Sequence, residues 1–157
     1  MIRVLVADDH PVVLHGLCTM LEVEDDIRVV ARATDGLEAV ARARETHPDI
    51  ILMDVQMPNV DGIEAIRRIR ADDPEAKVIV LTTYRNEDYI FPSLQAGARG
   101  YLLKDASLEE LASAIRAVGN YGEVYERDVG SKSPLGIPRG LNELWNLGGI
   151  QYAPPIR

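Results

Sequence analysis

Cysteine and long hydrophobic runs are scarce in this sequence of 157 residues. The one cysteine, Cys18, cannot form an internal disulfide, so nothing indicates an oxidising compartment. No apolar run approaches the roughly 18 residues that a membrane-spanning helix needs. Residues 1–9 are strand-like and too acidic for a signal peptide. These absences argue against disulfide-rich and membrane-spanning classes, and we expect a cytoplasmic protein with no membrane partner.

Positive charge is in short supply as well. Residues 1–118 contain 13 Lys and Arg against 21 Asp and Glu, which accounts for the whole net charge of -8, whereas residues 119–157 carry four of each. Neither part shows a basic patch, and the phosphate backbone of a nucleic acid would be repelled. The acidic first part instead fits a site that attracts a metal cation.

Five short apolar runs alternate with segments of helical spacing. The runs are rich in Val, Ile and Leu and nearly continuous, which is typical of parallel strands covered on both faces. They cover residues 2–7, 27–33, 49–54, 77–82 and 100–103. Strands that alternate with helices in this way predict an α/β fold with a doubly wound, five-stranded parallel sheet.

Two of the intervening helices have clear boundaries. Ser107 and Glu110 form an S-x-x-E capping box at the start of the last helix. The fourth helix is predicted to begin at an N-cap, Asn86, and to stop at Gly97. Pro92 falls in its middle, where a proline removes a backbone donor at a cost of about 3 kcal/mol. We therefore expect the fourth helix to be kinked or shortened.

Polar side chains stand where four of the predicted strands end. Asp8 and Asp9 follow the first strand, Asp54 ends the third, Thr82 ends the fourth and Lys104 follows the fifth. Ligands of an open parallel sheet bind beyond the carboxyl ends of its strands, so these groups should converge. Carboxylate oxygens suit Mg²⁺, and a hydroxyl and an ammonium suit phosphoryl oxygens. The pattern predicts a magnesium-dependent phosphoryl site.

The motifs that carry these residues resemble a known family. They read "VLVADDHP", "ILMDVQMPNVDG", "VIVLTTY" and "AGARGYLLKDAS". Together they resemble the response-regulator receiver domain of two-component signalling, which has a flavodoxin-like (CheY-like) fold, and the resemblance covers residues 1–118. The first and last motifs are similar to those of the NarL/FixJ subfamily, whose members usually carry a LuxR-type helix-turn-helix domain.

The resemblance implies a role for each acidic residue. Asp54 would accept a phosphoryl group from a sensor histidine kinase. Asp9, Asp54 and the backbone carbonyl of Gln56 would hold Mg²⁺, with Asp8 acting mainly through water. The resemblance gives His10, which lies beside the acids in sequence, no catalytic role.

The resemblance also implies how a phosphoryl group would be handled. Lys104 would pair with it, Thr82 would hydrogen-bond it, and Tyr101 occupies the position of an aromatic switch. Gln56 and Tyr84 would modulate dephosphorylation. Switching would repack the face made by the fourth helix, fifth strand and fifth helix, and so control output or a homodimer. Such a domain catalyses only its own phosphorylation and dephosphorylation.

Residues 119–157 differ from the rest, because they contain seven glycines and four prolines and lack periodicity. They are too short for a helix-turn-helix domain of roughly 60 residues, so we expect no DNA binding from this chain alone. They could be the poorly ordered tail, or a docking arm, of a single-domain receiver. They could also mark a truncated or frame-altered DNA-binding transcription regulator, or include residues foreign to the natural protein.

Two other functions compete with the phosphorylated switch. One is a magnesium-dependent phosphatase, but such enzymes usually present a D-x-D motif on the first strand, whereas Asp8 and Asp9 are adjacent. The other is a receiver-like interaction module that never takes phosphate. The presence of every expected site residue argues against this module without eliminating it.

Overall fold

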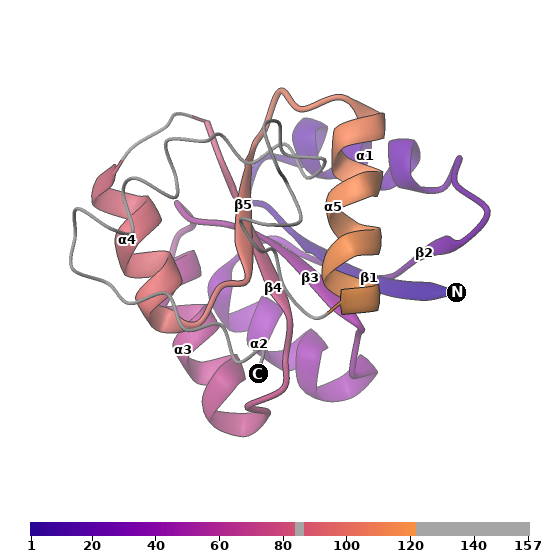
Figure 1. The fold of residues 1–157 in the computed structure, drawn as a ribbon. Coiled ribbons are helices and arrows are strands. Elements are labelled where there is room, and N and C mark those ends of the chain that lie inside the picture. The colour runs from indigo at the N-terminus through magenta and orange to yellow at the C-terminus, as the bar shows by residue number, and fades with distance from the viewer. Residues whose placement is uncertain (84–86, 122–157) are drawn as a thin grey trace.

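The structure, a computed structural model, describes residues 1–83 and 87–121. Its centre is a five-stranded parallel sheet in the order β2-β1-β3-β4-β5 (Figure 1). The strands are β1 (Ile2–Ala7), β2 (Ile27–Ala33), β3 (Ile50–Asp54), β4 (Val78–Thr82) and β5 (Gly100–Leu103). The doubly wound α/β fold is confirmed, and every strand lies within one residue of its predicted bounds.

Helices cover both faces of this sheet. They are α1 (Pro11–Leu21), α2 (Gly36–Thr46), α3 (Gly62–Asp72), α4 (Glu87–Ala96) and α5 (Leu108–Tyr121). Helices α1 and α5 pack together on one face, and α2, α3 and α4 line the other (Figure 1). Across residues 1–83 and 87–121, no helix combines the length and apolar character needed to cross a membrane.

The core sits on the central strands. Every residue of β3 and β4 is buried, because both strands have neighbours at each edge and helices on each face. Continuous apolar runs such as Ile50–Asp54 therefore suit their positions. Each large side chain buried here, Leu52 and Ile79 among them, contributes about 1.5–3 kcal/mol relative to an exposed position.

The predicted capping box at the start of α5 is confirmed. The Ser107 hydroxyl accepts a hydrogen bond from the Glu110 amide at 3.1 Å, and the Glu110 carboxylate accepts one from the Ser107 amide at 2.9 Å. Two amide donors that the helix itself leaves unpaired are thereby satisfied. The helix then continues to Tyr121, one turn past residue 118.

Helix α4 runs unbroken across Pro92 from Glu87 to Ala96. The proline therefore does not shorten the helix, and a bend there stays a prediction. Gly97 ends it with a φ of 115°, a backbone conformation that favours glycine, as the stop signal predicted. The Ser93 hydroxyl donates a hydrogen bond to the Tyr89 carbonyl at 2.6 Å in the turn that contains the proline.

Three sequence predictions fall outside the described residues. They are the helix cap at Asn86, the role of Tyr84, and the character of residues 122–157. These stay predictions.

A close backbone approach places the start of α3 against the end of β3. The Gly62 amide donates to the Val55 carbonyl at 2.8 Å, and a Cβ at Gly62 would lie 2.1 Å from the carbonyl oxygen of Asp54. We expect Gly62→Ala to lower the free energy of unfolding by at least about 2 kcal/mol, since backbone atoms must shift to admit the methyl group. Urea denaturation followed by circular dichroism measures this.

Gly16→Ala is the matched control, because a Cβ there meets nothing within 4 Å. It lies inside α1, so alanine should raise stability by about 0.5–1 kcal/mol through its better helix propensity. Equal stability of Gly62→Ala and the parent protein would contradict the close approach.

Candidate functional site

The parallel strand order brings the predicted site residues to one edge of the sheet. Asp8 directly follows β1, and Asp54 ends the neighbouring strand β3. Thr82 ends β4 and is the register partner of Leu103, so Lys104 emerges beside it. The Lys104 amide donates to the Thr82 carbonyl at 2.8 Å, which fixes the start of the loop after β5.

One ammonium faces two buried carboxylates at this edge. Lys104 Nζ lies 2.9 Å from Asp8 Oδ2 and 3.1 Å from Asp54 Oδ2. Asp8 is fully buried and Asp54 is 3% exposed, so water screens neither charge effectively. Two carboxylates and one ammonium leave a net negative charge that invites a further cation.

Burial perturbs the titration of both partners. Loss of solvent and the nearby Asp8 raise the pKa of Asp54 to about 6, against the opposing effect of Lys104. For Lys104, burial acts to lower the pKa, but hydrogen bonds and charge from Asp8 and Asp54 outweigh it and raise the pKa above its usual value. The ammonium of Lys104 therefore stays charged at neutral pH.

The site contains a histidine to which sequence reasoning gave no role. His10 Nδ1 lies 3.1 Å from Asp8 Oδ1 and 3.2 Å from Asp9 Oδ1. The Asp9 side chain is 28% exposed and the His10 side chain 63% exposed, so both stand on the solvent side of the cluster. The only sequence signal for this contact was that His10 directly follows Asp8 and Asp9 in "ADDHP".

These side chains fit a divalent cation. Asp8, Asp9, His10 and Asp54 each offer one ligand atom, and the four atoms lie within 4.8 Å of one another. Asp8 Oδ2 and Asp54 Oδ2 are buried oxygens that share the ammonium of Lys104, and Asp9 Oδ1 faces the imidazole of His10. Two buried carboxylates that share one ammonium leave an excess of negative charge, and hard oxygen ligands of this kind suit Mg²⁺.

Gln56 connects the site to α4. Its amide donates to Asp54 Oδ1 at 3.3 Å, and its side-chain Nε2 donates to the hydroxyl of Tyr89 at 2.6 Å. The loop after β3 thus contacts helix α4. Sequence reasoning did not identify Tyr89, because the contact joins segments 33 residues apart.

The two predicted switch residues are both buried. Thr82 is 6% exposed at the end of β4, and Tyr101 is 2% exposed in β5, where it pairs in register with Val80. They lie on adjacent strands, two register positions apart.

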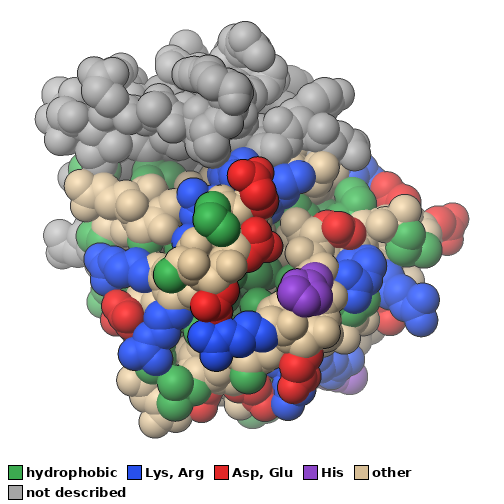
Figure 2. Space-filling model, turned by 90° about the horizontal axis from the view of Figure 1, so that it is seen from below, with side chains coloured by type: hydrophobic (Ala, Val, Ile, Leu, Met, Phe, Trp, Pro, Cys, Tyr) green, Lys and Arg blue, Asp and Glu red, His purple; other side chains and the backbone are tan. Residues whose placement is uncertain are grey.

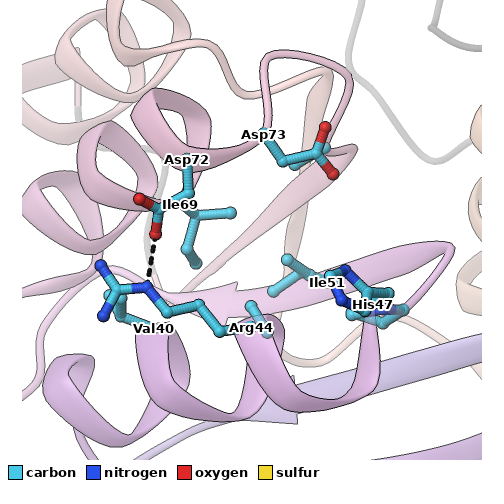
Figure 3. Close-up of a pocket in the computed structure, with 10 residues that line it drawn as sticks. Val40, Arg44, His47, Ile51, Ile69, Asp72 and Asp73 are labelled. Carbon is cyan, nitrogen blue, oxygen red and sulfur yellow. Dashed lines mark hydrogen bonds and ion pairs between the residues drawn. The ribbon is translucent and has the colours of Figure 1, made fainter.

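A separate hollow lies away from these groups. It has a volume of about 110 Å³ and lies between the ends of α2 and α3, near Ile51 at the start of β3 (Figure 3). Arg44 Nε pairs with Asp72 Oδ2 at 2.6 Å across its wall. Because ligands of open parallel sheets bind at the opposite, carboxyl edge, we do not take it as the functional site.

Surface charge does not mark another site on the face seen in Figure 2. Lys and Arg side chains are interspersed there with Asp and Glu. An interspersed surface of this kind favours solubility over the attraction of a highly charged partner.

The chain belongs to the response regulator receiver domain family. That family's pattern matches residues 4–116, which include all the strand-end residues described above. Among solved structures, a LuxR-family two-component response regulator from Aurantimonas sp. SI85-9A1 is similar with a TM-score of 0.74 and 37% identity, over 78% of this chain and 87% of that one.

Two relatives come from Bacillus subtilis (strain 168). The chain is 47% identical over 128 residues to the uncharacterized transcriptional regulatory protein YxjL, an alignment of 82% of this chain and 58% of the relative. It is 45% identical over 132 residues to the transcriptional regulatory protein LiaR, with 84% and 63% covered. The chain thus spans less than two thirds of the length of these relatives.

The raised pKa of Asp54 predicts a stability effect in the metal-free protein. The folded state favours the protonated carboxyl, so the free energy of unfolding should fall as pH rises from 3.8 towards about 6 and stay low above it. Asp54→Asn removes this ionisation. With EDTA near neutral pH, we expect the variant to be more stable by about 2–3 kcal/mol.

Urea denaturation across this pH range measures the difference. The exposed Asp25 provides the control, because Asp25→Asn removes the same charge from the surface and leaves the buried carboxylates in place. An Asp54→Asn protein no more stable than its parent would show that burial does not destabilise the ionised carboxylate.

Proposed function

We propose that the chain is a phosphorylation-controlled signalling switch in which Asp54 is the phosphoacceptor. The observation that carries the proposal is the position of the Asp54 carboxylate, buried at the end of β3 and 3.1 Å from the ammonium of Lys104. Membership of the receiver family supports it. The donor we propose is the phosphohistidine of a sensor histidine kinase, and the setting is cytoplasmic.

Phosphoryl transfer to Asp54 needs little covalent chemistry from the protein. A carboxylate oxygen of Asp54 attacks phosphorus, the phosphorus–nitrogen bond to the donor imidazole breaks, and an acyl phosphate forms. The released imidazole takes its proton from solvent. Lys104 stabilises the charge on the transferred oxygens, since its ammonium is held beside Asp54 before the reaction begins.

A magnesium ion is part of the proposal. The residues assigned to hold it are Asp9, Asp54 and the backbone carbonyl of Gln56, with Asp8 acting mainly through water. When bound, Mg²⁺ would reduce the repulsion between the carboxylates and an incoming phosphoryl group. The excess negative charge of two buried carboxylates that share one ammonium supports this assignment.

The switch is assigned to Thr82 and Tyr101. We propose that the hydroxyl of Thr82 moves to bond the phosphoryl group, and that Tyr101 repacks on the face formed by α4, β5 and α5. Gln56 adds a second route, because its side chain already bonds Tyr89 of α4. Phosphorylation would shift the population between two packings and thereby control a partner or a homodimer.

Control of transcription is a further proposal, because the two Bacillus relatives are called transcriptional regulatory proteins and the chain spans 58% and 63% of them. We assign no DNA contact to residues 1–121. A receiver-like module that works without phosphate stays the alternative, and the following experiment separates it from the switch.

Incubation with Mg²⁺ and acetyl phosphate should add one phosphoryl group, which intact-mass spectrometry detects. Asp54→Asn should abolish the adduct, because the amide is not a nucleophile. Lys104→Ala should slow its formation by about 100-fold or more, since one charge-stabilising donor is lost.

Asp25→Asn is again the control and should be phosphorylated like the parent protein. An adduct that persists in Asp54→Asn would move the phosphoacceptor elsewhere. Absence of an adduct in the parent protein with bound Mg²⁺ would favour the interaction module.

The lifetime of the acyl phosphate tests the role proposed for Tyr84. The bulky side chain two positions after Thr82 should limit the access of water, so Tyr84→Ala should hydrolyse roughly threefold faster or more. Tyr84→Phe keeps the bulk and should retain the slow rate. Phosphate release from purified acyl phosphate measures both, and equal rates in the alanine variant and the parent would refute the shielding role.

A further inference from the structure

The backbone conformation of His10 is restricted by the proline that follows it. Pro11 begins α1, and a residue before proline is restricted to extended conformations. His10 accordingly has φ −95° and ψ 110° and occupies the N-cap, but its side chain makes no capping hydrogen bond. Its amide instead donates to Asp8 Oδ1 at 2.9 Å.

This backbone turns the imidazole toward the acidic cluster. Nδ1 lies 3.1 Å from Asp8 Oδ1 and 3.2 Å from Asp9 Oδ1, so one nitrogen touches carboxylates of two residues. Adjacent ligands of an octahedral ion with bonds of about 2.1 Å lie about 3 Å apart. The nitrogen therefore stands at the spacing of a ligand beside Asp9 Oδ1, an oxygen of one of the residues assigned to hold the ion.

Buried oxygens give an independent sign that the cluster is built for a ligand. Asp8 is fully buried and Asp54 is 3% exposed, and the Oδ2 atoms of both residues face the one ammonium of Lys104. The ammonium of Lys104 compensates only one of the two charges. A bound dication would supply the missing positive charge.

We propose that His10 Nδ1 is a metal ligand of this site and shifts its preference from Mg²⁺ toward first-row transition-metal dications. Imidazole suits Ni²⁺, Co²⁺ and Zn²⁺, whereas Mg²⁺ prefers oxygen alone. The inference rests on the proposed function in so far as it uses the same carboxylates.

Metal selectivity tests the proposal on the full chain without an affinity tag. Calorimetry gives the dissociation constants of Ni²⁺ and Mg²⁺ for the parent protein and His10→Gln. The ratio of Ni²⁺ to Mg²⁺ affinity should fall by about tenfold or more in the variant, because only Ni²⁺ gains from the nitrogen. His15→Gln is the control, since His15 is an exposed histidine on α1, and it should keep the parent ratio. An unchanged ratio in His10→Gln would overturn the proposal.

Pulsed electron paramagnetic resonance of bound Mn²⁺ gives a second readout that needs no comparison of affinities. The parent protein and His15→Gln should show the nuclear modulation of a coordinated imidazole nitrogen, and His10→Gln should lose it. A parent spectrum without that modulation would overturn the proposal, as would a modulation that survives in His10→Gln.

The acetyl phosphate experiment, combined with the metal-binding measurements, distinguishes a failure of the His10 proposal from a failure of the proposed switch. Nitrogen coordination without phosphorylation of Asp54 would support the ligand role of His10 and overturn the switch. Phosphorylation without nitrogen coordination would overturn the role of His10 and leave the switch standing. Failure of the parent protein to bind any of these dications would overturn both.

Discussion

The rest of this structure depends on a single charge imbalance: two buried carboxylates, Asp8 and Asp54, share one ammonium, that of Lys104. In water three such charges would interact weakly, because the solvent screens them. Burial removes this screening, so each charge interacts strongly with the other two. Burial and the nearby charge of Asp8 raise the pKa of Asp54, and one ammonium cannot neutralise both carboxylates. A bound cation would stabilise these two buried carboxylates. The proposed chemistry therefore includes a dication.

The pairing of two strands brings the carboxylates together. Asp8 and Asp54 stand at the ends of the adjacent strands β1 and β3, whose apolar residues belong to the hydrophobic core. The start of α3 presses against the backbone of Asp54 itself, an approach that only glycine at position 62 permits. Stability provided by the core therefore offsets the strain of the site, as is common where function requires unfavourable electrostatics.

Gln56 links the edge of the sheet that bears the site to helix α4. Gln56 contacts Asp54 through its amide and Tyr89 through its side chain, so a change in charge at the carboxylate has a direct physical route to α4. Thr82 and Tyr101, the residues proposed for the switch, lie on the adjacent strands β4 and β5. These positions fit the proposed switch, whose output would be a change in packing rather than a chemical product.

The sequence by itself determined the strands, the doubly wound sheet and the meeting of Asp8, Asp54, Thr82 and Lys104. Each of those signals is local, because an apolar run predicts a strand and its last residues predict the edge. Only the tertiary structure decided that His10 turns toward the acids, that Gln56 reaches Tyr89 and that Gly62 lies against Asp54. The physical reason is that such contacts depend on side-chain direction and on distances between separate elements, and periodicity along the chain contains neither.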